Sequence, residues 1–330
     1  MIWLTWRQLR TQALVAGIVL AALAAYLLYL GVQIRADYRT DVLDCVPSDC
    51  TVTRRLFGNA YEAPIAIISL ILIAVPGLIG AFWGAPLVAR ELENRTDRLV
   101  WNQSVTRGRW LAVKLTVLGV AAVAVTGLYS LLLTWSASRY DEYVGSRFSA
   151  PNFGARGVAP LGYAAFAFVF GVVVGLVVRR TVASMAIVVA LYTALQIVVP
   201  LALRAHLMPP VTTEVKVTAD VMAHAQGFGM NDTSARILGY TQPGAWSMTP
   251  DNQVFMADGT PLTAARNKAC QTGSMDGDFA CMESKNLHFV YSYQPASRYW
   301  PFQWIETSAY LVLAGLLAGF GLWWVRRRIT

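Results

Sequence analysis

Long apolar runs recur along the chain, separated by polar stretches. A helix needs about 20 apolar residues to cross a bilayer core about 30 Å thick, and six runs reach that length. They are Ala13–Val32, Ala63–Ala89, Trp110–Trp135, Val158–Val178, Val182–Leu203 and Ile305–Val325. No Asp, Glu, Lys, Arg or His lies near the centre of any run. The pattern therefore predicts an all-α polytopic membrane protein with six transmembrane helices.

Three polar residues within these runs need an explanation. Lys114 and Glu306 lie near run ends, where long side chains are expected to snorkel toward the membrane interface. Gln196 lies deep in the fifth run, and we expect it to bond a neighbouring helix rather than a substrate, although both readings stay open.

Small residues and prolines mark places where helices approach or bend. Glycines four residues apart let two helices pack closely, and this spacing occurs at Gly80/Gly84, Gly171/Gly175 and Gly315/Gly319. Pro76 in the second run and Pro200 near the end of the fifth predict kinks.

The longest polar stretch, about 100 residues between Arg204 and Gln303, separates the fifth and sixth runs. Short β-rich segments at Thr213–Val217 and Phe289–Tyr293, with many turn residues between them, predict an α+β insertion. The expected domains are therefore residues 1–203, holding five helices and an N-terminal interfacial helix, the insertion 204–303, and the last helix with a basic tail, 304–330.

The charge distribution predicts an orientation. The chain has 27 basic and 19 acidic residues, and basic residues favour the cytoplasmic side. With both termini in the cytoplasm, the inner segments hold 13 basic and three acidic residues. The basic residues are Arg7, Arg10, six in the stretch 87–114, Arg179, Arg180 and Arg326 to Arg328. The net charge of +8 thus reports membrane topology rather than a nucleic-acid footprint.

The same orientation places all four cysteines on the extracytoplasmic side of the membrane. Cys45 and Cys50 fall in the first outer loop, and Cys270 and Cys281 fall in the insertion. Neither pair has metal-ligand spacing, so we expect two disulfides and no metal site.

Catalytic motifs are missing from the sequence. There is no GxxxxGK[ST], HExxH or GxSxG. Ion-coupled transport usually needs an ionisable residue inside the membrane, and none is central here. We therefore expect no catalytic site in this chain, and any transport must draw its energy from another protein.

The polar stretch from Leu87 to Lys114, LVARELENRTDRLVWNQSVTRGRWLAVK, carries an ordered pattern. It matches the arrangement E-x-E-x-G-T-x-x-x-L followed by P/S-[VI]-[ST]-R at Glu91, Glu93, Thr96, Val100 and Ser104 to Arg107, with Arg95 at the usual glycine. The chain thereby resembles the permease subunit of a bacterial ABC exporter of the type 2 class. The stretch from Gln294 to Glu306 also resembles an actinobacterial subgroup.

That resemblance implies a half-transporter in the bacterial plasma membrane. Two six-span permeases, as a homodimer or heterodimer, would work with two separately encoded ATPase subunits that bind ATP and Mg²⁺. The expected partners are thus the ATPase subunits, a second permease and membrane lipid. We expect no cofactor in this chain and no binding of nucleic acid. The stretch 87–114 would form a coupling loop seated on the ATPase, and the turn at Arg179–Thr181 would approach the same surface.

The resemblance also implies roles for particular residues. Those expected to couple to the ATPase are Glu91, Glu93, Thr96, Arg98 and Arg107. If Leu87–Trp101 is helical, the two glutamates lie near its beginning, in agreement with the helix dipole, and Leu92 is available to press into the partner. A solvated basic loop would explain the arginines but not the ordered carboxylates. The implied substrate cleft involves Phe82, Tyr192 and Gln196.

The predicted function is export of a hydrophobic or amphipathic substrate, such as a drug, antibiotic, peptide or lipid-like molecule. The alternative is a membrane sensor or immunity component whose outer segment binds an extracellular ligand without transport. A membrane-embedded enzyme is disfavoured because the catalytic groups are missing.

Overall fold

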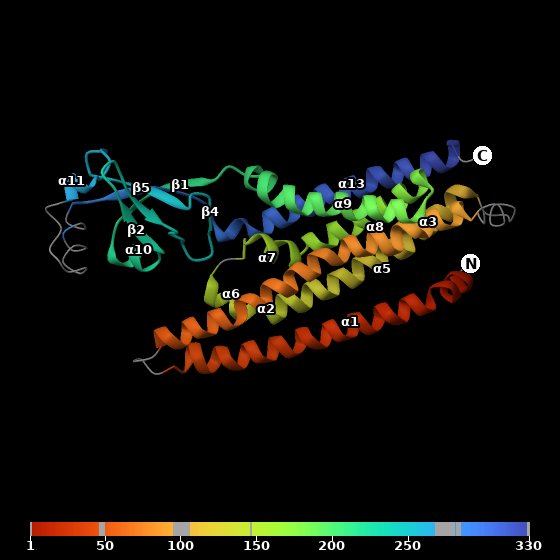
Figure 1. Cartoon of the computed structure of the whole chain (residues 1–330), viewed down its shortest axis with the longest axis horizontal. Coiled ribbons are helices and arrows are strands. Elements are labelled where there is room, and N and C mark those ends of the chain that lie inside the picture. The colour runs from red at the N-terminus through yellow and green to blue at the C-terminus, as the bar shows by residue number, and fades with distance from the viewer. Residues whose placement is uncertain are drawn as a thin grey trace. The chain divides into compact units, whose positions relative to one another are not determined.

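A computed structural model describes residues 2–45, 50–94, 106–145, 147–267, 281 and 285–328 (Figure 1). The chain divides into two compact units. A helical unit contains Met1–Tyr143, Ala150–Leu203 and Pro301–Thr330, and a smaller unit contains Val144–Ser149 and Arg204–Trp300.

The helical unit is built from long helices joined by short ones. In chain order they are α1 (Ile2–Tyr38), η1 (Arg39–Leu43), α2 (Cys50–Ile79), η2 (Gly80–Gly84), α3 (Ala85–Glu93), α5 (Arg107–Ser136), α6 (Ser138–Val144), α7 (Ala150–Ala155), α8 (Ala159–Val178), α9 (Thr181–Val198), η3 (Val199–Leu203) and α13 (Tyr299–Arg328). Both ends of the chain and the end of α3 lie at the same end of this unit (Figure 1), as an even number of crossings requires.

Six helical segments within the described ranges are long and apolar enough to span a membrane, which confirms the predicted number. The second is longer than its apolar run, because α2, η2 and α3 continue one another from Val52 to Glu93. The short helices α6 and α7 were not predicted. Residues 2–10, the described part of the ten-residue stretch for which we predicted an interfacial helix, form the beginning of α1 without a break.

The helix α8 packs against α2, α3, α5 and α9. Its sequence is apolar on every side, which suits a helix surrounded by other helices. Gly171 and Gly175 on α8 face Gly80 and Ala85 so closely that a Cβ added at Gly171 would lie 2.1 Å from the Gly80 carbonyl oxygen. The first two glycine pairs predicted for packing thus lie against one another.

The third glycine pair behaves differently. A Cβ added at Gly315 or Gly319 on α13 would meet no side chain and no backbone of another described segment within 4 Å. The same spacing therefore creates a tight helix contact at one place in this unit and none at another.

Two features interrupt the regular α-helical hydrogen bonding of the second span. Pro76 lies inside α2 and cannot donate a backbone hydrogen bond to the preceding turn. The five-residue π-helical turn η2 follows four residues later and carries Gly80 and Gly84. Such turns mark local changes in helix direction and are common at functional sites.

Cys45 and Cys50, on either side of the connection between η1 and α2, form a disulfide with Cα atoms 5.3 Å apart. This agrees with the pairing expected from the sequence. Cys281 is also disulfide-bonded, whereas Cys270 lies outside the described residues.

This disulfide offers a test of orientation. If the connection faces the oxidising side, Cys45 and Cys50 will react with a membrane-impermeant maleimide on intact cells only after an impermeant reductant is added. The matched control is the Cys45→Ser/Cys50→Ser variant, which should show two fewer labelled thiols under the same conditions. Equal labelling of both proteins after reduction would contradict the predicted topology.

The smaller unit holds an antiparallel sheet in the order β1-β6-β5-β3-β2, with β4 also paired to β6. The strands are β1 (Val211–Lys216), β2 (Gly227–Met230), β3 (Ala235–Leu238), β4 (Trp246–Ser247), β5 (Asp251–Phe255) and β6 (His288–Gln294), with short helices α10 (Ala219–Ala223) and α11 (Ala264–Asn267). The two segments predicted as strands pair with each other, Thr213 opposite Tyr291 and Val215 opposite Phe289.

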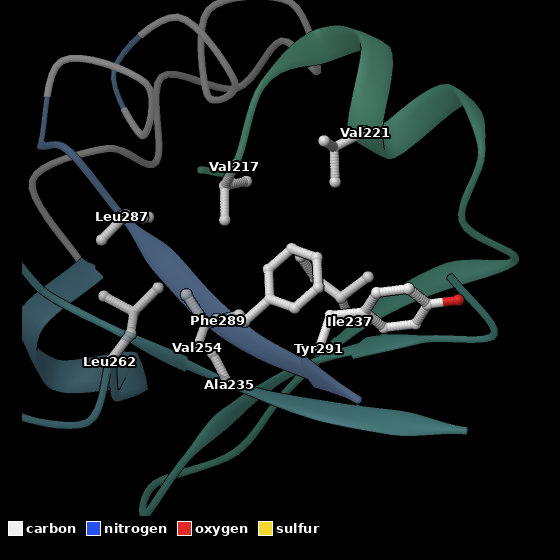
Figure 2. Close-up of a cluster of buried hydrophobic side chains, with 9 residues drawn as sticks. All are labelled: Val217, Val221, Ala235, Ile237, Val254, Leu262, Leu287, Phe289 and Tyr291. Carbon is white, nitrogen blue, oxygen red and sulfur yellow. The ribbon is translucent and has the colours of Figure 1, made fainter. Parts of the chain in front are cut away.

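The core of this unit follows from strand alternation. Phe289 and Tyr291 are two residues apart on β6, so their side chains leave the same face of the sheet. Figure 2 shows both rings on that face with Ile237, and Val221 of α10 above them. Thr218 caps α10 by accepting a hydrogen bond from the Val221 amide.

Candidate functional site

The two glutamates singled out in the sequence lie near the end of α3 and point in different directions. Residues two positions apart on an α-helix are separated by about 200° around its axis. Glu91 therefore turns toward α5 and Glu93 toward α9. Each carboxylate has a partner on the helix that it faces.

Glu91 forms an ion pair with Lys114 of α5, with Oε1 2.7 Å from Nζ. The Lys114 ammonium also lies 4.2 Å from the centre of the Trp110 ring, a cation–π contact. The Lys114 side chain is only 15% exposed. Lys114 is therefore mostly buried, and a carboxylate and an aromatic ring compensate its charge there; whether it reaches the membrane interface stays a prediction.

Glu93 binds the first residue of α9. Its Oε2 accepts hydrogen bonds from the Thr181 amide at 3.0 Å and from the Thr181 hydroxyl at 2.7 Å. The first amides of a helix lack partners within the helix, and they carry the positive end of its dipole. Glu93 thus acts as an N-terminal cap supplied by another helix.

The position of these glutamates corrects one expectation. α3 ends at Glu93, and the Asn94 amide bonds back to the Arg90 carbonyl. Both carboxylates consequently lie in the last turn of their helix, where its dipole disfavours negative charge. The ion pair with Lys114 and the cap on α9 provide the compensation.

The other predicted coupling residues are placed unevenly. Thr96 and Arg98 lie outside the described residues. Arg107 is the first residue of α5, and its role in coupling stays a prediction. Leu92, predicted to contact a partner protein, packs instead against a buried cluster of this chain that includes Val88 and Leu111.

The turn between α8 and α9 is tight and basic. Arg179 has a φ of 57°, a left-handed conformation that costs energy for any residue with a Cβ. Its amide bonds the Gly175 carbonyl and ends α8, and Arg180 is extended. This reversal brings the Thr181 amide to Glu93. Both arginine side chains are exposed, so this end of the unit presents positive charge.

A hydrogen bond joins two of the three predicted cleft residues, Tyr192 and Gln196. The third, Phe82, takes no part in it. The buried Tyr192 hydroxyl donates to the Ile73 carbonyl at 2.7 Å and accepts from Gln196 Nε2 at 2.9 Å. Gln196 thus bonds its own helix, not a neighbouring one. Phe82 is 54% exposed on η2.

Tyr192→Phe is expected to destabilise the helical unit by about 1 kcal/mol, because the Ile73 carbonyl near Pro76 loses its donor. Thermal unfolding in detergent would measure the loss. Tyr26→Phe is the matched control, since Tyr26 is 42% exposed on α1. Equal stability of the two variants would show that the hydroxyl contributes nothing.

A buried polar cluster, not predicted from the sequence, lies where α6, α7 and α8 meet α13. Arg156 Nη1 pairs with Asp141 Oδ1 at 2.5 Å, and the two side chains are only 2% and 4% exposed. Burial raises the pKa of the neighbouring Tyr140 hydroxyl to about 12, with a further effect from the Glu62 carboxylate. The ion pair therefore lies in surroundings that disfavour unpaired charge.

The beginning of α13 completes this cluster. Gln303 Oε1 accepts from the Val158 and Ala159 amides at 3.0 and 2.8 Å and so caps α8. Glu306 is 3% exposed and accepts a hydrogen bond from the Tyr163 hydroxyl. Glu306 therefore does not snorkel as predicted. Its position one residue inside the sixth apolar run was the available signal, because a carboxylate there needs a buried donor.

A family model described as ABC-2 membrane transporter related matches residues 17–204 of the chain. The matched range covers the first five spans, both glutamates of α3 and the α8–α9 turn. No curated protein and no solved structure matches the chain.

Proposed function

Because this chain belongs to the ABC-2 membrane transporter related family, we propose that it is the permease subunit of an ATP-driven exporter. The family match over residues 17–204 carries this proposal. The six apolar helices make the chain a multi-pass membrane protein, and the family supplies the membrane component of ABC transporters rather than the catalytic one.

The proposed complex contains two permeases and two ATPase subunits, and the ATPase subunits bind ATP and Mg²⁺. Its cytoplasmic face is the end that carries the last turn of α3, the α8–α9 turn and the end of α13. Exposed arginines gather there: Arg90, Arg109, Arg179, Arg180, Arg326 and Arg327. The basic residues support this orientation, and the plasma membrane of a bacterium, of the actinobacterial subgroup, is the proposed location.

The proposed substrate is hydrophobic or amphipathic, and it leaves the cytoplasm or the inner leaflet through a cleft between two permeases. Tyr192, Gln196 and Phe82 are proposed to line this cleft. Support for an apolar substrate comes from η2 and α9, whose exposed side chains are largely apolar, including Phe82, Leu191 and Ile197.

Affinity purification from native membranes in mild detergent tests the proposal. The tagged chain should retain a protein that contains a GxxxxGK[ST] phosphate loop, and the complex should hydrolyse ATP in a vanadate-sensitive manner. Reconstituted vesicles should then accumulate a fluorescent amphipathic cation in the presence of ATP. A preparation from native membranes that contains no such ATPase would refute the proposal.

A further inference from the structure

We propose that Glu93 is a positioning residue that passes movement of the coupling loop to α9 by holding the first turn of that helix. This inference rests on the proposed function, since the movement would begin at an ATPase bound to the loop. It assigns different tasks to Glu91 and Glu93, which the sequence pattern treats alike.

The helix that carries Glu93 packs closely on two neighbouring helices at its beginning. α3 packs on both α8 and α9. A Cβ added at Gly175 of α8 would lie 2.4 Å from the Ala85 carbonyl oxygen of α3, so the two backbones touch. On the other side, Ala81 and Ala85 are fully buried against Val188 of α9. These contacts are made at, or just before, the first residue of α3, which lies eight residues before Glu93.

The link to α9 is made at the end of α3 nearest the coupling loop. Glu93 is the last residue of α3 and lies within the stretch 87–114 that forms the proposed coupling loop. Its carboxylate holds both the amide and the hydroxyl of Thr181. A displacement of the loop therefore pulls directly on the first turn of α9.

Glu91 makes the contrasting contact. Its ion pair with Lys114 joins the same end of α3 to α5, on the opposite side of the helix. One loop is thus connected to two spans through two carboxylates. Only the Glu93 connection leads to the helix that holds Tyr192 and Gln196.

A rigid α9 would carry the displacement toward the proposed cleft. Tyr192 lies 11 residues after Thr181, about three turns or 16 Å along the helix. Its hydroxyl donates to the Ile73 carbonyl, three residues before Pro76. Movement of α9 would therefore act on the part of α2 that contains Pro76 and leads into η2.

The first experiment measures the link without any ATPase. Hydrogen exchange of the purified chain should be about fivefold faster in the first turn of α9 in Glu93→Ala, because a helix cap is lost. Glu93→Gln, which keeps one acceptor oxygen, should be intermediate, and Thr181→Ser should match the wild type. Glu91→Gln is the matched control, since it alters the other side of α3 and should leave α9 exchange unchanged.

The second experiment measures transmission in the complex purified with its ATPase. A nitroxide on Leu191→Cys, an exposed position of α9, reports the response to ATP with orthovanadate. The spectrum should change in the wild-type background and stay unchanged in Glu93→Ala, with the two complexes compared at equal amounts of bound ATPase. Glu142→Gln, at the opposite end of the unit, should respond like the wild type.

The outcomes separate the two proposals. A response of α9 that persists in Glu93→Ala, or exchange that does not change, overturns the role of Glu93 and leaves the exporter intact. A wild-type chain that brings no ATPase from native membranes removes the exporter and, with it, this inference. A purely structural role would lower ATPase binding in Glu93→Ala as well, and that result would also overturn it.

Discussion

Gly171→Ala is expected to destabilise the helical unit by about 2–3 kcal/mol, because the new methyl group would overlap a backbone atom of another helix. The added Cβ would lie 2.1 Å from the Gly80 carbonyl oxygen and 3.0 Å from the Ala85 nitrogen. Neither atom belongs to a flexible side chain, so α8 must move away from η2 and α3. Thermal unfolding in detergent, followed by size-exclusion chromatography, would measure the loss.

Gly315→Ala and Gly319→Ala are the matched controls for this prediction. They make the same chemical change in the same spacing, at positions where a Cβ meets no side chain and no backbone of another described segment within 4 Å. Both should be as stable as the wild type or slightly more stable, since alanine favours a helix more than glycine does. If Gly171→Ala unfolds at the same temperature as these controls, the close contact between α8 and η2 is wrong.

Asp141→Asn is expected to cost about 3–5 kcal/mol, because it leaves the Arg156 guanidinium buried without a compensating charge. The Arg156 side chain is 2% exposed, so water cannot replace the lost partner. Asp141→Asn/Arg156→Met should recover much of the loss, since no buried charge remains. Chemical unfolding of the purified variants would compare them.

The neighbouring pair Arg139–Glu142 provides the control. Its side chains are 48% and 45% exposed, and exposed ion pairs contribute little to stability. Glu142→Gln should therefore unfold like the wild type. A similar loss in Glu142→Gln and Asp141→Asn would show that the Asp141–Arg156 pair is open to water.

The six spans could be predicted because the bilayer imposes a local requirement. A segment such as Val158–Val178 must be apolar along its whole length, and that property is visible without knowing its neighbours. For Thr213–Val217 and Phe289–Tyr293, the sequence predicted the two strands but not their pairing. Each strand could be recognised by composition, but more than 70 residues separate them, and their register depends on the folded sheet.

The candidate site shows the same division. The pattern Glu91-x-Glu93 drew attention to the right turn of the chain. The predicted position of the two glutamates at the beginning of a helix was wrong, because the helix ends at Glu93. Partners 23 and 88 residues away, Lys114 and Thr181, decide what each carboxylate does, and no local pattern contains them.

The amino-acid sequence alone was enough to predict six helices long and apolar enough to cross a membrane, and the stretch Leu87–Lys114 pointed to the ABC-2 type family that the family model matches. Length, apolarity and short motifs are properties of single segments. Only the tertiary structure decided that Gly171 meets Gly80 while Gly315 meets nothing, and that Asp141 and Arg156 bury one another's charge. Contacts of this kind depend on which helices become neighbours, and the packing of the whole unit selects them.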